Sequence, residues 1–305
     1  MLARDGTEEA AGNAANRMTV RQMGFAYPQT MSGHWNAKRP EFSQIVNAAS
    51  LAMPYLEPYL IRTMRAARAQ IRDEALRREL DSYVSQEASH YRQHRKFNEE
   101  LKARGYRSIE KLEAKIDASY KRIEAGGSLA SNLAYAEGFE SMALAIGEML
   151  IEDRDFLFGE SESGVASLVL WHFVEEIEHK NVAYDVFEHV AGNYFRRVGG
   201  FLHAATHIFL LTRAGYRELL KEDGLWRNLR SRLALARLLI RIFWKLTPKL
   251  ARILVPGYNP RQVADPAWAL AWARLFTKDG EAAGRLDTTR LDQREPVPHA
   301  ARTTA

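Results

Sequence analysis

The sequence predicts an all-α protein built on a four-helix bundle with additional C-terminal helices. Apolar residues recur at steps of three and four along the middle of the chain, and no stretch shows the alternating pattern that is typical of strands. The chain has 305 residues, of which 46% are hydrophobic, and this is enough apolar material for a large core. Disorder along the whole chain is therefore excluded.

Four long helical segments are expected to form the bundle. Pro54 suits the first turn of the first segment, because its missing N–H would be unpaired there in any helix. Asp73 is the predicted N-cap of the second segment, and Gly105 is predicted to end it. The four segments are predicted at residues 54–70, 73–105, 108–153 with a break at the glycines 126 and 127, and 163–190.

Composition divides the chain into four parts. Residues 1–20 and 278–305 are polar and carry no sustained apolar repeat, so both are predicted to be disordered tails. The bundle is assigned to residues 21–195. A basic, amphipathic extension at 196–277 is expected to pack on the bundle through helices at about 198–222, 226–254 and 268–276.

The absence of cysteine limits the chemistry. It excludes disulfides, thiolate zinc sites and cysteine-ligated iron–sulfur clusters, so any metal must be held by His and carboxylate side chains. The first twenty residues contain no apolar run of the kind found in secretory signals. We therefore expect a cytoplasmic protein.

Charged side chains occupy positions of the second helix that should face the core. Glu87, His90 and His94 fall on the same stripe as Leu80 and Phe97. An ionised carboxylate buried without a partner costs several kcal/mol, so such a group must be paired, protonated or bound to a metal.

The other three predicted helices show the same feature. Their inward-facing polar residues are Glu57 on the first helix, Glu137 and Glu140 on the third, and His172, Glu175, Glu176 and His179 on the fourth. Two helices thus carry Glu-x-x-His and two offer single glutamates, which is the ligand pattern of ferritin-like di-iron and di-manganese bundles. Residues at i and i+3 share a helix face, so the Glu can bridge two metals while the His binds one. A buried salt-bridge network with nearby arginines is the alternative.

Four segments of the chain resemble a known family. The most specific are the QExxHxxxHxxFN block at residues 86–98 and the HxxEExEHK block at residues 172–180. Together with SLAMPYLEPYL and LAYAEGFESMAL, they resemble the bacterial family named "predicted metal-dependent hydrolase", of the ferritin-like superfamily, over about residues 40–260. The resemblance implies a di-metal centre with the ligands Glu57, Glu87, His90, Glu137, Glu176 and His179. Glu140 falls where the family more often has a small polar residue, so Glu137 is preferred to it.

Further residues are expected beside the ligands. His94 could be an additional ligand, as in the similar N-oxygenating di-iron enzymes, or a core histidine. His172 is expected to support a ligand, and Glu175 to accept the free N–H of a ligand His on another helix. Asp185 could form a supporting pair with Lys180.

These features predict a metal-dependent enzyme that holds two metal ions, with iron favoured and manganese or zinc as alternatives. The carboxylate-rich site favours dioxygen-dependent oxidation of a small or lipid-like substrate, and no Ser-His-Asp, GxSxG or HExxH arrangement indicates conventional hydrolysis. Hydrolysis through a metal-bound hydroxide is the alternative that the family name implies. A non-enzymatic metal- or membrane-binding protein is the second alternative. No motif identifies a catalytic residue.

The basic residues are concentrated near the C-terminus. Nine basic and no acidic residues lie at positions 224–264, which leaves a charge of −4 for the rest of a chain whose formal net charge is +5. The helix predicted at 226–254 could cover the bundle with its basic face in water, or lie on the inner face of a membrane. Nucleic-acid binding is not expected, because no known module accompanies the charge. A homodimer stays open.

Overall fold

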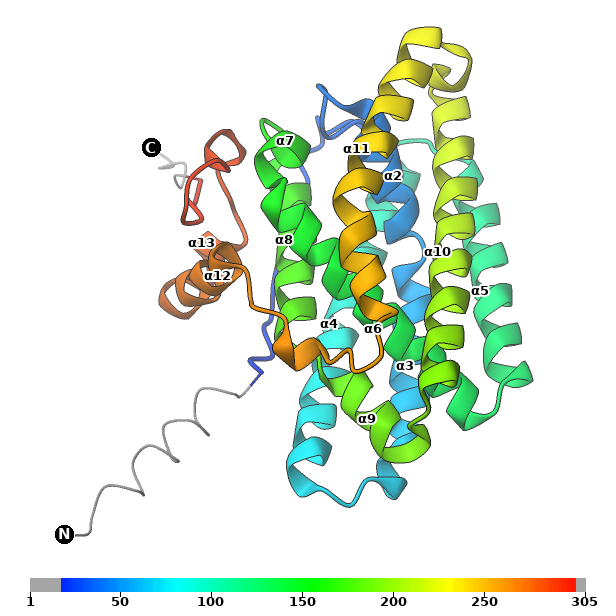
Figure 1. Cartoon of the computed structure of the whole chain (residues 1–305). Coiled ribbons are helices and arrows are strands. Elements are labelled where there is room, and N and C mark those ends of the chain that lie inside the picture. Colours follow the sequence, from blue (N-terminus) through cyan, green and yellow to red (C-terminus); the bar gives the residue numbers. More distant parts are fainter. Residues whose placement is uncertain (1–17, 300–305) are drawn as a thin grey trace, which may run out of the picture.

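The computed structural model of the chain describes residues 18–299, and within that range the fold is all-helical (Figure 1). The α-helices are α2 (Pro40–Ser50), α3 (Met53–Ala67), α4 (Glu74–Ala103), α5 (Ser108–Gly126), α6 (Leu129–Glu152), α7 (Arg154–Phe158), α8 (Ser163–Glu178), α9 (Val182–Ala191), α10 (Tyr194–Glu222), α11 (Leu229–Ile253), α12 (Ala267–Lys278) and α13 (Gly280–Ala283). Four 3₁₀ turns are η1 (Arg68–Gln70), η2 (Leu225–Arg227), η3 (Pro260–Gln262) and η4 (Thr288–Arg290). The prediction of an all-α protein is confirmed.

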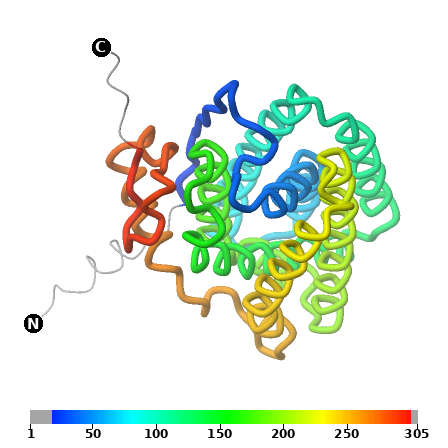
Figure 2. The backbone as a smooth tube through the Cα atoms, turned by 90° about the horizontal axis from the view of Figure 1, so that it is seen from above, coloured from blue at the N-terminus to red at the C-terminus, as the bar shows by residue number. Residues whose placement is uncertain are grey.

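Helices α3, α4, α6 and α8 lie at the centre of the molecule. Helix α3 packs on α4 and α6, and α8 packs on α6 and α4, so the four helices contact one another in a closed ring. Helix α5 covers α3, while α10 covers both α6 and α2. Figure 2 shows that the C-terminal segment with α12 lies beside α8, on the side away from α10 and α11.

The predicted capping residues act as expected. The Asp73 carboxylate accepts hydrogen bonds from the backbone N–H groups of Ala75 and Leu76 and so begins α4. Gly105 has a φ of +95°, a left-handed conformation that favours glycine just past a helix end. The predicted start and end of the second helix are therefore confirmed.

The structure differs from the predicted helices in two places. An additional helix, α2, precedes α3; its buried face is mostly polar, so an apolar repeat does not reveal it. The predicted fourth helix is divided into α8 and α9 at residues 179–181. The apolar repeat continues across this break, because both helices bury the same side of the chain.

The predicted disordered tail at 278–305 does not match the structure as far as residue 299. Leu286 and Leu291 are buried, and the Thr288 hydroxyl donates to the backbone oxygen of Ser161. This segment packs through single buried apolar residues, which form no periodic pattern in the sequence. Residues 1–17 of the predicted N-terminal tail lie outside the described residues.

The basic side chains in the second half of α11 pair with acidic groups of the bundle, whereas Arg230, Arg232 and Arg237 near its start are exposed. Arg241 pairs with Asp153 at 2.6 Å, Lys249 with Glu152 at 2.7 Å, and Arg252 with Glu148 at 2.5 Å. The acidic partners lie at the C-terminal end of α6 and directly after it. Over residues 18–299, no helix has both the length and the apolar content that crossing a membrane requires.

Glycines allow α10 to approach α6 closely. A Cβ atom on Gly200 would lie 2.1 Å from the backbone oxygen of Ala134, and one on Gly138 would lie 2.4 Å from the Cα atom of Phe201. Neither obstacle is a flexible side chain. The contact between the two helices therefore depends on these two glycines.

We expect the substitution Gly200→Ala to destabilise the protein by about 1–3 kcal/mol, because the added methyl group forces α10 away from α6. Gly199→Ala is the matched control, since nothing lies within 4 Å of its added Cβ atom. That variant should be neutral or more stable by up to about 1 kcal/mol. Thermal unfolding checks both values, and equal melting temperatures for the two variants would contradict the close contact.

Candidate metal centre

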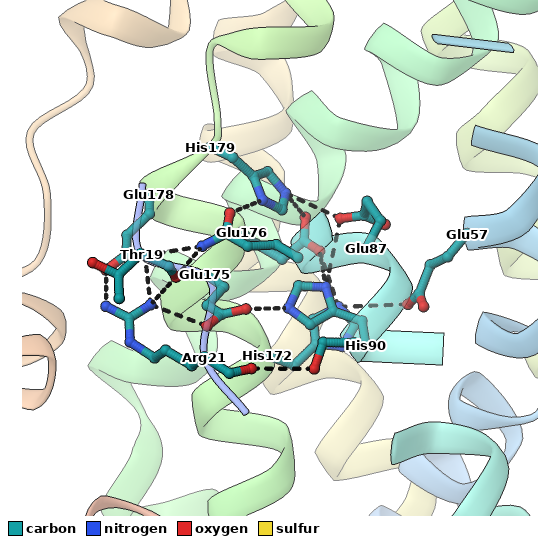
Figure 3. Close-up of polar contacts among 12 residues, drawn as sticks. Thr19, Arg21, Glu57, Glu87, His90, His172, Glu175, Glu176, Glu178 and His179 are labelled. Atoms are coloured by element: carbon teal, nitrogen blue, oxygen red, sulfur yellow. Dashed lines mark hydrogen bonds and ion pairs between the residues drawn. The ribbon is translucent and has the colours of Figure 1, made fainter. Parts of the chain in front are cut away.

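Two groups of buried side chains meet in the interior (Figure 3). The first contains Glu57 of α3, His90 of α4 and His172 of α8. The second contains Glu87 of α4, Glu176 of α8 and His179 directly after α8. Within each group, one donor atom from every residue lies within 4.8 Å of the others. Five of the six predicted ligands thus meet here, and His172 joins them.

Helical spacing brings these side chains together. Glu87 and His90 are three residues apart on α4, so both point from the same face. His172 is one turn before Glu176 on α8, and the His172 Nε2 atom lies 3.0 Å from Glu176 Oε1. Since α4 and α8 are packed against each other, their two polar faces meet.

Glu87 and Glu176 lie between the two groups. Glu176 Oε1 faces His172 of the first group, while Glu176 Oε2 lies 3.3 Å from His179 Nε2 of the second. Glu87 Oε1 lies 3.5 Å from His90 Nδ1 and 3.4 Å from His179 Nε2. Both carboxylates therefore occupy positions suited to bridging two cations.

Many buried polar atoms at this centre have no hydrogen-bond partner among residues 18–299. They are both carboxylate oxygens of Glu57 and of Glu87, Glu176 Oε1, Glu140 Oε2 and His90 Nδ1. Each would cost several kcal/mol without compensation, whereas cations would satisfy them together. Carboxylate and imidazole donors suit iron, manganese or zinc. The residues present therefore fit two bound metal ions.

Hydrogen bonds orient two of the imidazoles. His90 Nε2 lies 3.0 Å from Glu175 Oε2, which leaves the Nδ1 atom on the side of the carboxylates. His179 Nδ1 lies 3.1 Å from Gln86 Oε1, which leaves Nε2 on that side. The role predicted for Glu175, an acceptor for a His of another helix, agrees with this geometry. Such bonds fix the tautomer and the ring plane of a metal-binding histidine.

The structure places His172 beside the carboxylates and His94 behind it, whereas the sequence left His94 open as a ligand or a core histidine. His172 was expected to support a ligand, but its Nε2 atom faces Glu176 and lies 4.0 Å from Glu57. His94 lies one step further out, with Nε2 2.8 Å from His172 Nδ1 and Nδ1 2.8 Å from Ser50 Oγ. Because both His94 nitrogens have protein partners, this residue supports His172.

Glu140, and not the preferred Glu137, lies beside the centre. Glu140 Oε2 is 3.3 Å from His179 Nε2, and Glu140 Oε1 accepts a hydrogen bond from Tyr83 at 2.7 Å. Glu137 accepts a hydrogen bond from Ser141 and lies 3.9 Å from Arg197 of α10. Three residues turn a helix by about 300°, which is enough to direct these two glutamates to different neighbours.

The supporting pair expected between Asp185 and Lys180 does not form. Asp185 pairs with Arg261 at 2.5 Å, and Lys180 binds Asp265 and the backbone oxygen of Val263. The break between α8 and α9 turns both side chains towards the segment that follows α11. Asp185 is therefore not part of the centre.

An apolar cavity of about 210 Å³ adjoins the centre. His94 and His172 form the polar part of its wall, together with Ser50 and Thr212, and the remaining lining residues are apolar. They come from α2, α3, α6, α8, α10 and α11. Any molecule bound in this cavity would lie against apolar side chains and next to the imidazole of His172.

The sequence model of a family described as "predicted metal-dependent hydrolase" matches residues 19–264. The chain belongs to this family. The match includes every residue of the centre, and it confirms the resemblance noted in the sequence. Comparison with curated proteins gave no significant match, and comparison with solved structures gave none either.

In this member of the family, the sequence did not reveal three residues that support the centre. Gln86 orients His179, and its position at the start of the QExxH block could have indicated a role. Tyr83 holds Glu140, but a core tyrosine gives no distinct signal. Arg21 binds both Glu175 and Glu178 at 3.0 and 2.6 Å, from a segment far away in the sequence. No local pattern predicts such a pairing.

Burial and repulsion shift the pKa values of the centre. Burial, with Glu87 and Glu176 nearby, raises the pKa of Glu57 well above its usual range. Burial likewise raises the pKa of Glu140 to about 8, with a further contribution from Glu176. Burial opposes the ionisation of Glu176 as well, but His179 and His172 outweigh it and hold the Glu176 pKa well below normal. The metal-free protein thus retains protons at this centre.

We expect Glu176→Ala and His179→Ala each to lower the metal content from about two ions per chain, because each removes a donor of the second group. Both variants should stay folded, as judged by circular dichroism. Glu137→Gln is the control, and its metal content by elemental analysis should equal that of the wild type. Loss of metal from the control alone would mean that Glu137 is the ligand after all.

The stability of the metal-free protein should fall as the pH rises. Folding raises the pKa of Glu140 from 4.5 to about 8 and that of His90 from 6.5 to about 10, where Glu175 and Glu87 outweigh the opposing effect of burial. Burial lowers the pKa values of His94 and His172, and this opposes the effect below about pH 6.5. Above that pH the folded state binds more protons than the unfolded state, so stability is lost from about pH 7 through about pH 10. Metal binding requires deprotonated carboxylates and should reverse the trend. Urea midpoints with and without chelator test this, and a metal-free midpoint that rises over the range would contradict it.

Proposed function

We propose that this protein is a di-metal enzyme that oxidises an apolar or lipid-like substrate with dioxygen. The observation that carries the proposal is the pair of ligand groups, joined by Glu87 and Glu176, beside an apolar cavity. The closed ring of α3, α4, α6 and α8 supplies all of the donor residues except His179, which directly follows α8. This arrangement supports a ferritin-like four-helix bundle as the fold of the core.

Each ion would have its own set of donors. Glu57, His90 and His172 would hold one ion. His179 and Glu140 would hold the other, with Glu87 and Glu176 shared between the two. Iron or manganese bound there would supply the electrons for dioxygen chemistry. Two divalent ions would also balance the charge of the four carboxylates.

The side chains around the centre have distinct tasks in this proposal. The cavity binds an apolar substrate by removing it from water. His94, held by Ser50, keeps the His172 ring in one orientation. Tyr83 holds one oxygen of Glu140 and leaves the other facing His179. No Lys, Arg, Asp or Glu occurs among the described residues that line the cavity, so a charged substrate group has no partner within it.

The family description favours a second function, metal-dependent hydrolysis. Redox-inert ions such as zinc would lower the pKa of water at the same donors. The two functions make different demands on the metal, since only oxidation needs iron or manganese. A protein that binds metal and has no turnover would be the non-enzymatic alternative.

Metal analysis and dioxygen uptake test the proposal. We expect about two iron or manganese ions per chain. The reduced protein should show an optical change that requires dioxygen, and should consume dioxygen faster with straight-chain alcohols of increasing length. A protein that contains only zinc and cleaves esters would be a hydrolase and not an oxidase. Bound iron without any response to dioxygen would contradict oxidation.

A variant of the cavity gives the matched control. Ala143 lines the cavity but does not belong to either ligand group. Ala143→Phe should keep the metal content and lower turnover by about tenfold or more, because small displacements of a bound substrate are costly. Full turnover in this variant would mean that the substrate binds elsewhere.

A further inference from the structure

Helices α10 and α11 leave large apolar side chains exposed on the outside of the molecule. We name Phe209, Leu210, Leu233, Ile240, Phe243 and Trp244 the outer apolar face; each of these residues is between 54% and 82% exposed. Isolated exposed apolar residues are common, but a set of this size along two neighbouring elements marks an interaction surface.

Helix α11 has more apolar surface than covering the core requires. Its inward side buries Leu235, Leu238 and Ile253, and its basic side is paired with α6. The outward side, with Ile240, Phe243 and Trp244, packs against no described residue that would bury it. A helix that only covers a core has a polar outward side.

Arginines without acidic partners surround this face. Arg213, Arg230 and Arg237 are exposed, and the structure pairs none of them with a carboxylate among the described residues. No acidic residue occurs at positions 224–264. Arg232 stacks on the ring of Trp226 and likewise pairs with no carboxylate among residues 18–299. The face therefore suits a partner that combines negative charges with an apolar layer.

We propose that the outer apolar face docks on an anionic lipid bilayer. Phe243 and Trp244 would enter the boundary between headgroups and acyl chains, where Trp is favoured, and the arginines would bind lipid phosphates. The helices would lie on the membrane, in agreement with the absence of a membrane-crossing helix in the described part of the chain.

Docking on this face would place the apolar cavity at the bilayer. On α10, the lining residue Ile208 directly precedes the exposed Phe209, and on α11 the lining residue Ile242 directly precedes the exposed Phe243. An apolar substrate could then pass from the membrane to the cavity without crossing water. This last step depends on the proposed function, whereas the docking itself does not.

Charge argues against a second copy of the chain as the occupant. A two-fold contact brings the same surface of both copies together. The unpaired arginines of one copy would then face those of the other, with no acidic residue of 224–264 to separate them. Lipid phosphates provide the opposite charge without this repulsion.

Vesicle flotation with the full-length, metal-loaded protein tests the docking. We expect the protein to float with vesicles of phosphatidylcholine and phosphatidylglycerol, more weakly with phosphatidylcholine alone, and more weakly in high salt. The double variant Phe243→Ser/Trp244→Ser should lose at least about tenfold in partitioning. Arg230→Gln and Arg237→Gln should each lower it by about fivefold on anionic vesicles. Leu270→Ser, at an exposed apolar position of α12, is the matched control and should float like the wild type.

Other outcomes would overturn the proposal. Failure of the wild type to float with anionic vesicles excludes docking, and so does undiminished flotation of the double variant. A lipid-free dimer that the double variant dissociates would assign the face to self-association. Glu176→Ala, which is expected to lose metal, should still float, so a failure of the proposed function would leave this result unchanged.

Discussion

The arrangement of the whole molecule depends on the burial of four carboxylates in one small space. Glu57, Glu87, Glu140 and Glu176 come from four helices, and their repulsion is strong because little water screens it. Three imidazoles and two cations would turn this repulsion into attraction. Without metal, the raised pKa values of Glu57 and Glu140 keep protons at the centre, and these protons reduce the repulsion between the helices.

Supporting contacts extend from the centre to the N-terminal segment and to α12. Arg21 binds Glu175, which in turn holds His90. The guanidinium of Arg21 lies over the rings of Trp272 and Phe276 in α12, at 5.5 and 5.1 Å from their centroids. Helix α12 thus packs against the arginine that binds Glu175, the carboxylate that orients the His90 imidazole.

Helix α11 contacts the bundle, the cavity and the solvent with different sides. The basic side binds acidic groups at the end of α6, and the inward side closes the apolar cavity. The outward side supplies part of the outer apolar face. Because Ile242 and Leu246 of α11 line the cavity, a membrane bound to the outward side of this helix would lie next to the cavity wall.

The sequence by itself determined the helical class, the caps of α4, the His and carboxylate donor set and the family, because all of these depend on spacing along the chain. It also indicated that Glu87, His90, Glu176 and His179 share inward faces. Only the tertiary structure decided between Glu137 and Glu140, placed His172 among the donors with His94 behind it, and brought Arg21 to Glu175. The physical reason is that periodicity defines a face about 100° wide, whereas the rotation of each helix against its neighbours selects the side chains within that face. Contacts between distant segments have no period, so only packing could reveal them.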